Sequence, residues 1–532
     1  MPRRATTTAV GDERHAACTL PAGPPRVDAA SGLPGDGESY AIALHRIRAE
    51  ASTFQSSNAM TAAKPLNLHP DRLFPSDSTQ RAIARRLYAE VVGLPIVSPH
   101  GHTDPSWWAA DAPFANATEL LLVPDHYVFR MLYSQGIGLD ALGIPRADGS
   151  RAQVDPRSAW RLFAQHFHLF RGTPSSMWLN HVFHDVFGLR ERLGADSADR
   201  YYDAITDALQ TDAFRPRALF ERFHIEVIAT TESPLDPLGH HEAIRDSGWN
   251  GRVVTAYRPD PVIDPEHEQF PSALERFGEI TGENVYDWEG YLRAHRQRRA
   301  FFAAMGATST DHGHPSCATA DLPADQARAL FTRVVTGKAT AADAELFRAQ
   351  MLTEMAAMSL DDGLVMQIHP GCFRNHNRPL FERYGRDKGA DIPLRTDYVH
   401  ALKPLLDRFG NEPSFRLILF TLDESTYARE LAPLAGHWPC LFLGPAWWFH
   451  DSPEGMWRFR EQTLGTAGFY NTVGFNDDTR AFLSIPARHD VARRIDCAVL
   501  AKLVAEHRIE EDEAAEVAAD LAYRLPKEAY RL

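Results

Sequence analysis

Cysteine is scarce in this sequence of 532 residues, and its scarcity excludes two kinds of crosslinked fold. The five cysteines (Cys18, Cys317, Cys372, Cys440 and Cys497) are scattered, and none forms a CxxC pair. This spacing indicates neither a disulfide framework nor a structural zinc cluster. We therefore expect a reducing, cytoplasmic setting.

Long apolar runs and an excess of positive charge are also missing. No run of about 18 apolar residues occurs, so the sequence predicts no membrane span. The N-terminal residues include two early arginines but no continuous apolar stretch, unlike a secretory signal. Lys and Arg number 56 against 70 Asp and Glu, giving a net charge of −14. Nucleic acid and anionic membranes are poor candidates as partners, because both need a basic surface.

The content of hydrophobic residues (44%) and charged residues (24%) is typical of a folded protein, and the chain can bury a large core. Residues 1–59 are the exception, being rich in Ala, Gly, Pro, Ser and Thr. Such a segment buries too little apolar surface to offset its chain entropy, so we predict that it is disordered. It is either a flexible tail or the product of a wrongly assigned start, with Met60 as the real beginning; the second is slightly favoured.

Residues 60–532 contain eight short apolar runs that predict strands. The runs begin at Leu94, Ile225, Arg252, Ala303, Leu364, Arg416, Cys440 and Asn471. Helix-like segments such as SALERFGEITG separate most of them, and this alternation predicts parallel βαβ units. Eight units predict an α/β fold, a (β/α)₈ barrel of the TIM type. The aromatic-rich residues 103–222 predict an inserted helical lobe between the first and second strands, and residues 324–363 predict two helices before the fifth.

Polar residues follow most of these runs, at the end of each strand where barrel active sites lie. His100 and His102 follow the first run, His369 ends the fifth, and Asp478 and Arg480 follow the eighth. Two residues apart on a strand, His100 and His102 share a face and can reach one cation. Asp478 would complete a mononuclear metal site. The alternative is that His102 caps a helix and that Asp478 is solvated.

Other polar residues leave two interpretations open. Arg258 and Arg480 either pair with acidic residues or bind a substrate carboxylate in bidentate fashion, which is favoured. Trp447 either packs in the core or contacts a sugar. His369 is either an ordinary buried hydrogen-bonding group or, as its strand-end position favours, a catalytic one.

The fourth run is followed by TDHGHP, which holds a second pair of histidines. His314 lies in a loop with Gly and Pro, which predicts a surface turn. For Asp311 and His312, two interpretations are equally open: they line the active-site pocket, or they lie outside it.

From about residue 65 to the C-terminus, the order and spacing of motifs resemble a known family. The motifs include LPIVSPHGHTDP, PDHYVFRMLYSQG, TAYRPD, GATSTDHG, MQIHPGCFRNHN, AWWFHDSPEGM and GFNDDTRAFLSIPARHD. They resemble the uronate isomerases (glucuronate/galacturonate isomerases) of the amidohydrolase superfamily. Gly101, Thr103, Val128 and Glu232 depart from the usual family motifs, which indicates a divergent member.

The resemblance implies metal ligands at His100, His102 and Asp478. It also implies active-site roles for His126 and Tyr127, and for Arg258, His369 and Arg480. One divalent ion is expected, with Zn²⁺ favoured and Mn²⁺, Fe²⁺ or Ni²⁺ left open. Barrels of this kind often associate, so a homo-oligomer is an expectation by analogy alone.

The implied reaction interconverts an aldose and a ketose uronate, a small acidic sugar. As a hypothesis, Asp478 acts as the base, and Tyr127 with His126 or His369 polarises the carbonyl and manages the second proton. Arg258 and Arg480 would hold the carboxylate or the enediolate oxygens. The alternative is a metal-dependent hydrolase of a small lactone, ester or amide that carries a carboxylate. A sugar-binding protein without activity is a third interpretation.

Overall fold

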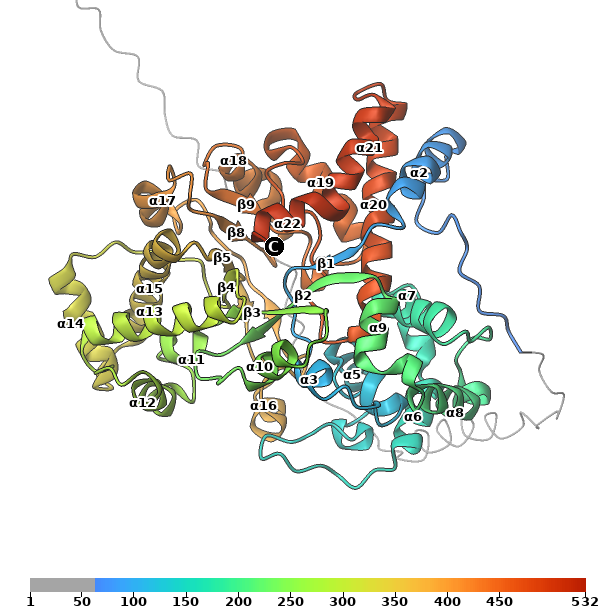
Figure 1. The fold of residues 1–532 in the computed structure, drawn as a ribbon, viewed down its shortest axis with the longest axis horizontal. Coiled ribbons are helices and arrows are strands. Elements are labelled where there is room, and N and C mark those ends of the chain that lie inside the picture. The colour runs from blue at the N-terminus through green and yellow to red at the C-terminus, as the bar shows by residue number, and fades with distance from the viewer. Residues whose placement is uncertain (1–62) are drawn as a thin grey trace, which may run out of the picture. The chain divides into compact units, whose positions relative to one another are not determined.

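The computed structural model describes residues 63–532, and a curled sheet of seven parallel strands lies at their centre (Figure 1). The order is β1–β2–β3–β4–β5–β8–β9, so each strand pairs with the next one along the barrel. The strands are β1 (Ile96–Ser98), β2 (Ile225–Glu232), β3 (Arg252–Tyr257), β4 (Ser309–His312), β5 (Val365–Ile368), β8 (Leu417–Leu419) and β9 (Leu441–Leu443). Helices cover the outside, and the predicted α/β barrel of the TIM type is confirmed.

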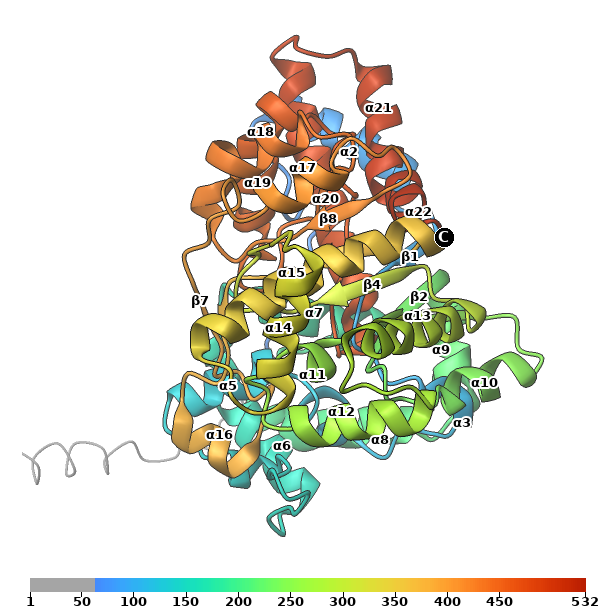
Figure 2. The same cartoon turned by 90° about the vertical axis from the view of Figure 1, so that its left-hand side faces the viewer.

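The helices from β2 to the C-terminus surround the sheet, and several of them pack apolar residues against it (Figure 2). They are α10 (Gly239–Asp246), α11 (Asp260–Ile263), α12 (Phe270–Thr281), α13 (Trp288–Ala304), α14 (Ala324–Val335), α15 (Ala341–Asp362), α16 (Arg378–Tyr384), α17 (Lys403–Phe409), α18 (Ala432–Ala435), α19 (Pro453–Ala467), α20 (Ile485–Ala505), α21 (Glu511–Ala519) and α22 (Leu525–Tyr530). The two helices predicted before the fifth strand are α14 and α15. A hairpin of β6 (Cys372–Phe373) and β7 (Ile392–Pro393) interrupts the path from β5 to β8.

The helical lobe predicted between the first two strands is present, coloured blue to green in Figure 1. Its helices are α3 (Ser106–Ala110), α4 (Ala117–Leu121), α5 (His126–Ser134), α6 (Pro156–Gln165), α7 (Pro174–His181), α8 (Ala198–Leu209) and α9 (Pro216–Arg222). Buried aromatic residues such as Trp108, Trp160 and Phe163 form its core. The lobe places α5 at the cavity described below.

The predicted fourth strand was wrong in its position. Ala303 and Ala304 belong to the last turn of α13, and β4 begins only at Ser309. Gly306 ends the helix in the left-handed region, with φ 96°. A glycine adopts this conformation without the steric cost that a side chain would bring.

The predicted eighth strand was also wrong as a regular strand. Among the described residues, the segment from Asn471 pairs with the sheet only through one parallel bridge, between Leu443 and Thr472. Gly474 follows with φ 78°, which turns the backbone out of the extended conformation that a ladder needs.

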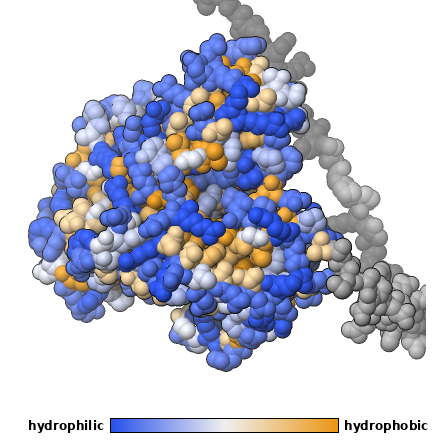
Figure 3. All heavy atoms as spheres, turned by 45° about the vertical axis from the view of Figure 1, so that its right-hand side comes forward, coloured by the Kyte–Doolittle hydropathy of each residue, from blue (hydrophilic) through white to orange (hydrophobic). Residues whose placement is uncertain are grey.

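The two ends of the described chain pack onto the barrel. Helix α2 (Ser78–Val91) is capped by Asp77 and lies beside α20, where Leu87 meets Leu500 in one apolar cluster (Figure 1). The predicted N-terminal extension, residues 1–59, lies outside the described residues. No helix of residues 63–532 is both long enough and apolar enough to cross a membrane. The face shown in Figure 3 is mainly hydrophilic, with apolar residues among the polar ones.

The C-terminal residues enter the base of the barrel, next to β1 (Figure 1). Tyr530 is fully buried, and its hydroxyl accepts a hydrogen bond from Asn476 Nδ2 (2.6 Å) and donates one to Gln367 Oε1 (2.8 Å). Leu532 packs on apolar residues of the first three strands, including Val97. The chain end therefore packs beside the segment that fails to form an eighth strand.

Candidate active site

A cavity of about 1310 Å³ opens at the carboxyl ends of the strands. All the site residues predicted from the sequence line it: His100, His102, His126, Tyr127, Arg258, His369, Trp447, Asp478 and Arg480. They come from segments far apart in the chain. The barrel brings them together because the carboxyl ends of parallel strands share one rim.

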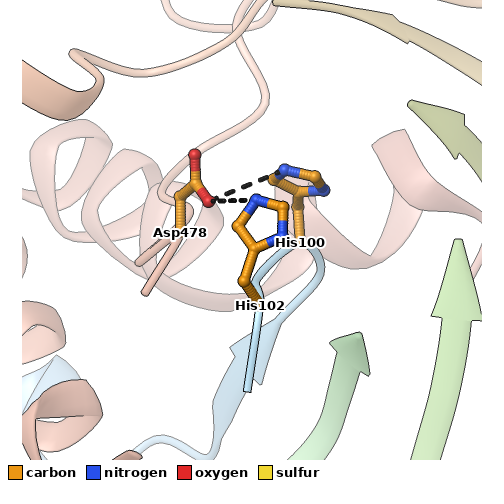
Figure 4. A group of neighbouring side chains, drawn as sticks. All are labelled: His100, His102 and Asp478. Atoms are coloured by element: carbon orange, nitrogen blue, oxygen red, sulfur yellow. Dashed lines mark ion pairs between the residues drawn. The ribbon is translucent and has the colours of Figure 1, made fainter. Parts of the chain in front are cut away.

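Of the residues that line this cavity, His100, His102 and Asp478 face one another (Figure 4). Asp478 Oδ1 lies 3.7 Å from His100 Nε2 and 3.3 Å from His102 Nε2. The backbone N–H of His102 donates to Thr479 O (3.1 Å), which ties the loop after β1 to the loop that carries Asp478. Asp478 has φ 38°, a left-handed conformation that is costly for a residue with a side chain and is typical of functional sites.

The protonation states of His100 and Asp478 favour the binding of a cation. Burial lowers the pKa of His100 to about 4, so its imidazole is neutral at pH 7. Burial opposes ionisation of Asp478, but His100 and His102 outweigh it and lower the pKa of Asp478 below its ordinary value. Two imidazoles and a carboxylate are thus ready to bind a divalent metal, and their ligand atoms lie within 4.8 Å of one another.

His369 lies beside the triad, at the end of β5. Its ring stacks on His100 with centroids 4.7 Å apart, and its Nδ1 lies 2.7 Å from Asp311 Oδ1. Its Nε2 has no hydrogen-bond partner among residues 63–532. His100, Asp311 and His369 form a second group that could hold a metal. However, Arg258 Nη1 lies 3.0 Å from the other oxygen of Asp311, so this carboxylate already has a cationic partner.

The two arginines pair with acidic residues in the structure. Arg258 Nε donates to Asp260 Oδ2 (2.9 Å), in addition to its pair with Asp311. Arg480 Nη2 donates to Asp387 Oδ2 (2.9 Å). A guanidinium has five N–H donors, so these pairs leave donors for a further carboxylate. The two interpretations made for these arginines are therefore compatible.

His126 and Tyr127 open α5, and Asp125 caps this helix by accepting from Tyr127 N (2.9 Å). The two rings stack with centroids 5.2 Å apart. Burial and the nearby Arg480 lower the pKa of His126 to about 3, so its imidazole is neutral. Its buried Nε2 lacks a hydrogen-bond partner within the described chain. Trp447 is largely buried, and its indole N–H donates to Asp478 Oδ2.

The predicted surface turn at His314 was wrong, because its side chain is only 2% exposed. His314 packs near His312, with ring centroids 5.9 Å apart, and neither lines the cavity. Asp311 and His312 are themselves the last two residues of β4, rather than part of the loop after it.

Sequence reasoning missed two buried residues behind Tyr127. Tyr127 Oη donates to Asp451 Oδ2 (3.0 Å), and Arg488 Nη1 donates to the same oxygen (3.0 Å). Asp451 ends the motif AWWFHD, so its place after the seventh apolar run was a signal that could have found it. Arg488 lies near the start of α20, inside the motif GFNDDTRAFLSIPARHD but eight residues after Arg480, so no strand end marks it.

Comparison with known proteins decides the family of this barrel. The family model described as glucuronate isomerase matches residues 77–530. The chain belongs to the glucuronate isomerase family. The resemblance to uronate isomerases of the amidohydrolase superfamily is thereby confirmed.

Members of this family match almost along their whole length. A uronate isomerase of Xanthomonas campestris pv. campestris (strain B100) is 80% identical over 468 residues, covering 88% of this chain and 99% of the relative. The crystal structure of glucuronate isomerase from Caulobacter crescentus has a TM-score of 0.87 at 67% identity, covering 88% of this chain and 98% of that one. Uronate isomerase from Thermotoga maritima has a TM-score of 0.81 at 26% identity, covering 87% and 99%.

Proposed function

We propose that this protein interconverts aldose and ketose uronates: D-glucuronate with D-fructuronate, and D-galacturonate with D-tagaturonate. The observation that carries the proposal is the convergence of His100, His102, Asp478 and two arginines on one cavity of a glucuronate isomerase fold. Hydrolysis is not favoured, because the chain matches isomerases over most of its length. The four described cysteines are buried and free, which supports the expected cytoplasmic setting.

The proposed metal is Zn²⁺, held by His100, His102 and Asp478. Two imidazoles and a carboxylate suit Zn²⁺, and one ligand atom of each residue lies within 4.8 Å of the others. When bound, the ion would supply a Lewis acid toward substrate oxygens.

Moving the carbonyl from C1 to C2 requires four changes. The C2 proton leaves, a proton returns to C1, the C2 hydroxyl loses its proton, and the C1 oxygen gains one. We assign the transfer of the proton from C2 to C1 to Asp478, because its carboxylate is ionised and lines the cavity. Tyr127, with His126 or His369, polarises the carbonyl and handles the protons at oxygen. The two histidines each have a buried nitrogen for which residues 63–532 offer no hydrogen-bond partner.

The acidic group of the sugar is assigned to the arginines. Arg258 and Arg480 line the cavity, and each is oriented by the acidic residues with which it pairs. A planar guanidinium binds a carboxylate through two parallel hydrogen bonds, which an uncharged sugar cannot offer. Selectivity for uronates over neutral aldoses is therefore expected.

Proton NMR tests the proposal directly. D-Glucuronate and D-galacturonate are each incubated with the zinc-loaded protein in D₂O. The expected result is the matching ketose, with the mass of the sugar unchanged apart from deuterium. Deuterium at carbon would report exchange during proton transfer. A product heavier by one water would indicate hydrolysis, and no change in either sugar would contradict the proposal.

A further inference from the structure

The hydroxyl of Tyr127 has one direction fixed by the protein. Oη donates to Oδ2 of Asp451 at 3.0 Å, so the phenol proton points away from the cavity. Tyr127 lines the cavity, whereas Asp451 lies behind it and contributes nothing to the lining. The oxygen of Tyr127 therefore offers a lone pair, rather than a proton, to a substrate.

Asp451 is itself fixed by Arg488. Arg488 Nη1 donates to the same carboxylate oxygen at 3.0 Å, while Nε donates to Ser484 Oγ (3.1 Å). The guanidinium carbon lies 3.5 Å above the ring of Trp178, and this ring meets Tyr127 edge to face with centroids 5.7 Å apart. These contacts leave Arg488 and Asp451 little freedom to rotate.

The arrangement joins three distant segments of the chain. Tyr127 comes from α5 of the helical lobe, Asp451 from the loop after β9, and Arg488 from α20. The side chain of Arg488 is 2% exposed and that of Asp451 is 11% exposed. Breaking a buried pair is costly, so a charge pair at this depth needs good geometry to persist. Here the pair is oriented so that Asp451 Oδ2 also accepts the hydrogen bond of the Tyr127 hydroxyl.

We propose that Asp451 is a positioning residue that makes Tyr127 a proton acceptor toward the C2 hydroxyl of the sugar. This inference rests on the proposed isomerase function and assigns Tyr127 one of its two suggested tasks. Polarisation of the carbonyl is left to His126 or His369.

Tyr127 and Asp451 together carry the hydroxyl proton of the sugar during the reaction. As Asp478 takes the C2 proton, the C2 hydroxyl proton passes to Tyr127 Oη and the phenol proton passes to Asp451 Oδ2. The electron pair of the broken O–H bond stays on the substrate oxygen, which becomes the ketose carbonyl. Asp478 then returns its proton to C1, and the relay runs backward to deliver the hydroxyl proton to the C1 oxygen. No outside oxidant or reductant is needed.

At neutral pH the two groups are in the protonation states that the relay starts from, a protonated phenol and an ionised carboxylate. Burial raises the pKa of Asp451 to about 6, although Arg488 opposes the rise. Burial and Asp451 also raise the pKa of Tyr127, so the phenol keeps its proton at neutral pH.

A double-mutant cycle separates this role from a structural one. Asp451→Asn, Tyr127→Phe and the double variant are compared with the wild type in steady-state assays with the uronate that turns over. We expect each single variant to lower kcat at least 30-fold with KM changed less than threefold. Because Asp451 acts only through the phenol, the double variant should be no slower than Tyr127→Phe.

The chain offers a closely matched control. Arg460 and Asp496 form a buried pair outside the cavity lining, with side chains 5% and 11% exposed. Asp496→Asn breaks the same kind of contact and should lower the melting temperature without the loss in kcat. Asp451→Asn combined with Arg488→Gln removes both charges of the first pair. It therefore provides a second variant should the single one fail to fold.

The outcomes distinguish the two proposals. Multiplicative losses in the double variant, or a kcat for Asp451→Asn close to that of Asp496→Asn, would overturn the role of Asp451 alone. A wild-type protein that isomerises neither uronate would overturn the proposed function, and the role of Asp451 with it.

Discussion

Trp447 donates its indole N–H to Oδ2 of Asp478, while the other oxygen of that carboxylate faces His102 Nε2 at 3.3 Å. The tryptophan was expected to pack in the core or to contact a sugar. It does pack in an apolar cluster, and its N–H also holds the carboxylate of Asp478 beside the two histidines. Trp447 therefore donates a hydrogen bond to the proposed base and also lines the cavity.

Trp447→Phe should therefore slow catalysis rather than weaken sugar binding. The phenyl ring keeps much of the packing but removes the donor, and hydrogen bonds to charged groups contribute about 1.5–3 kcal/mol. We expect kcat to fall roughly 10- to 100-fold, since each 1.36 kcal/mol is about tenfold in rate. Steady-state kinetics check this. A rise in KM at unchanged kcat would instead assign Trp447 to the sugar.

Asp478→Asn should abolish turnover, because the amide cannot accept the C2 proton. General-base contributions are on the order of 10²–10⁴-fold, and losing a proposed metal ligand adds to the effect. NMR in D₂O should show neither ketose nor deuterium at C2. Retention of the wild-type rate would remove Asp478 from the role of base.

Removal of the metal should abolish activity and lower stability together. A ligand that binds only the native state stabilises it by mass action, so dialysis against a chelator should lower the melting temperature. Added Zn²⁺ should restore both, at about one ion per chain by elemental analysis. His102→Ala should reduce the metal content. His400→Ala alters an exposed histidine and is the matched control. Full activity after complete removal of metal would contradict the site.

The sequence was most informative about residues next to strand ends. His100 and His102 follow a short apolar run directly, so their place on the barrel rim could be predicted from local pattern and topology. Arg488 could not, because it lies inside a helix whose buried face includes several arginines. Its contact with Asp451 depends on how α20 packs against the loop after β9, which one-dimensional periodicity does not encode.

The predicted positions of strands were wrong where tertiary contacts outweighed local propensity. The residues around Ala303 are small and apolar, which suits a helix end as well as a strand, and Gly306 decides between them through its positive φ. The depth of His314 likewise depends on tertiary contacts, because Asp264, which follows α11, and Arg348 of α15 lie near it.

Glu232 is expected to make stability depend on pH. Burial raises its pKa from 4.5 to about 7, even though the hydroxyl of Thr255 opposes the rise. Below pH 4.5 the carboxyl is protonated in both states. Between pH 4.5 and 7 the unfolded chain loses this proton and the native state keeps it, so stability falls as pH rises.

Glu232→Gln should remove this part of the pH dependence. Relative to the variant, the wild type should lose on the order of 2–3 kcal/mol of unfolding free energy between pH 4 and pH 8. Denaturant unfolding at the two pH values measures the difference. Unfolding free energies that change in parallel for the two proteins would show that the Glu232 carboxyl ionises normally in the folded state.

Tyr530→Phe tests whether the C-terminus supports the site from below. The change leaves the buried amides of Gln367 and Asn476 each without one hydrogen bond, at a cost of about 1–3 kcal/mol per unsatisfied group. The melting temperature should fall. Because Asn476 lies two residues before Asp478, kcat should fall as well, by roughly three- to tenfold, while KM stays close to the wild-type value. Tyr427→Phe removes another fully buried tyrosine hydroxyl, one without a hydrogen-bond partner in residues 63–532, and serves as the control. If Tyr530→Phe lowers the melting temperature but leaves kcat unchanged, the C-terminal residues stabilise the barrel without positioning the loop of Asp478.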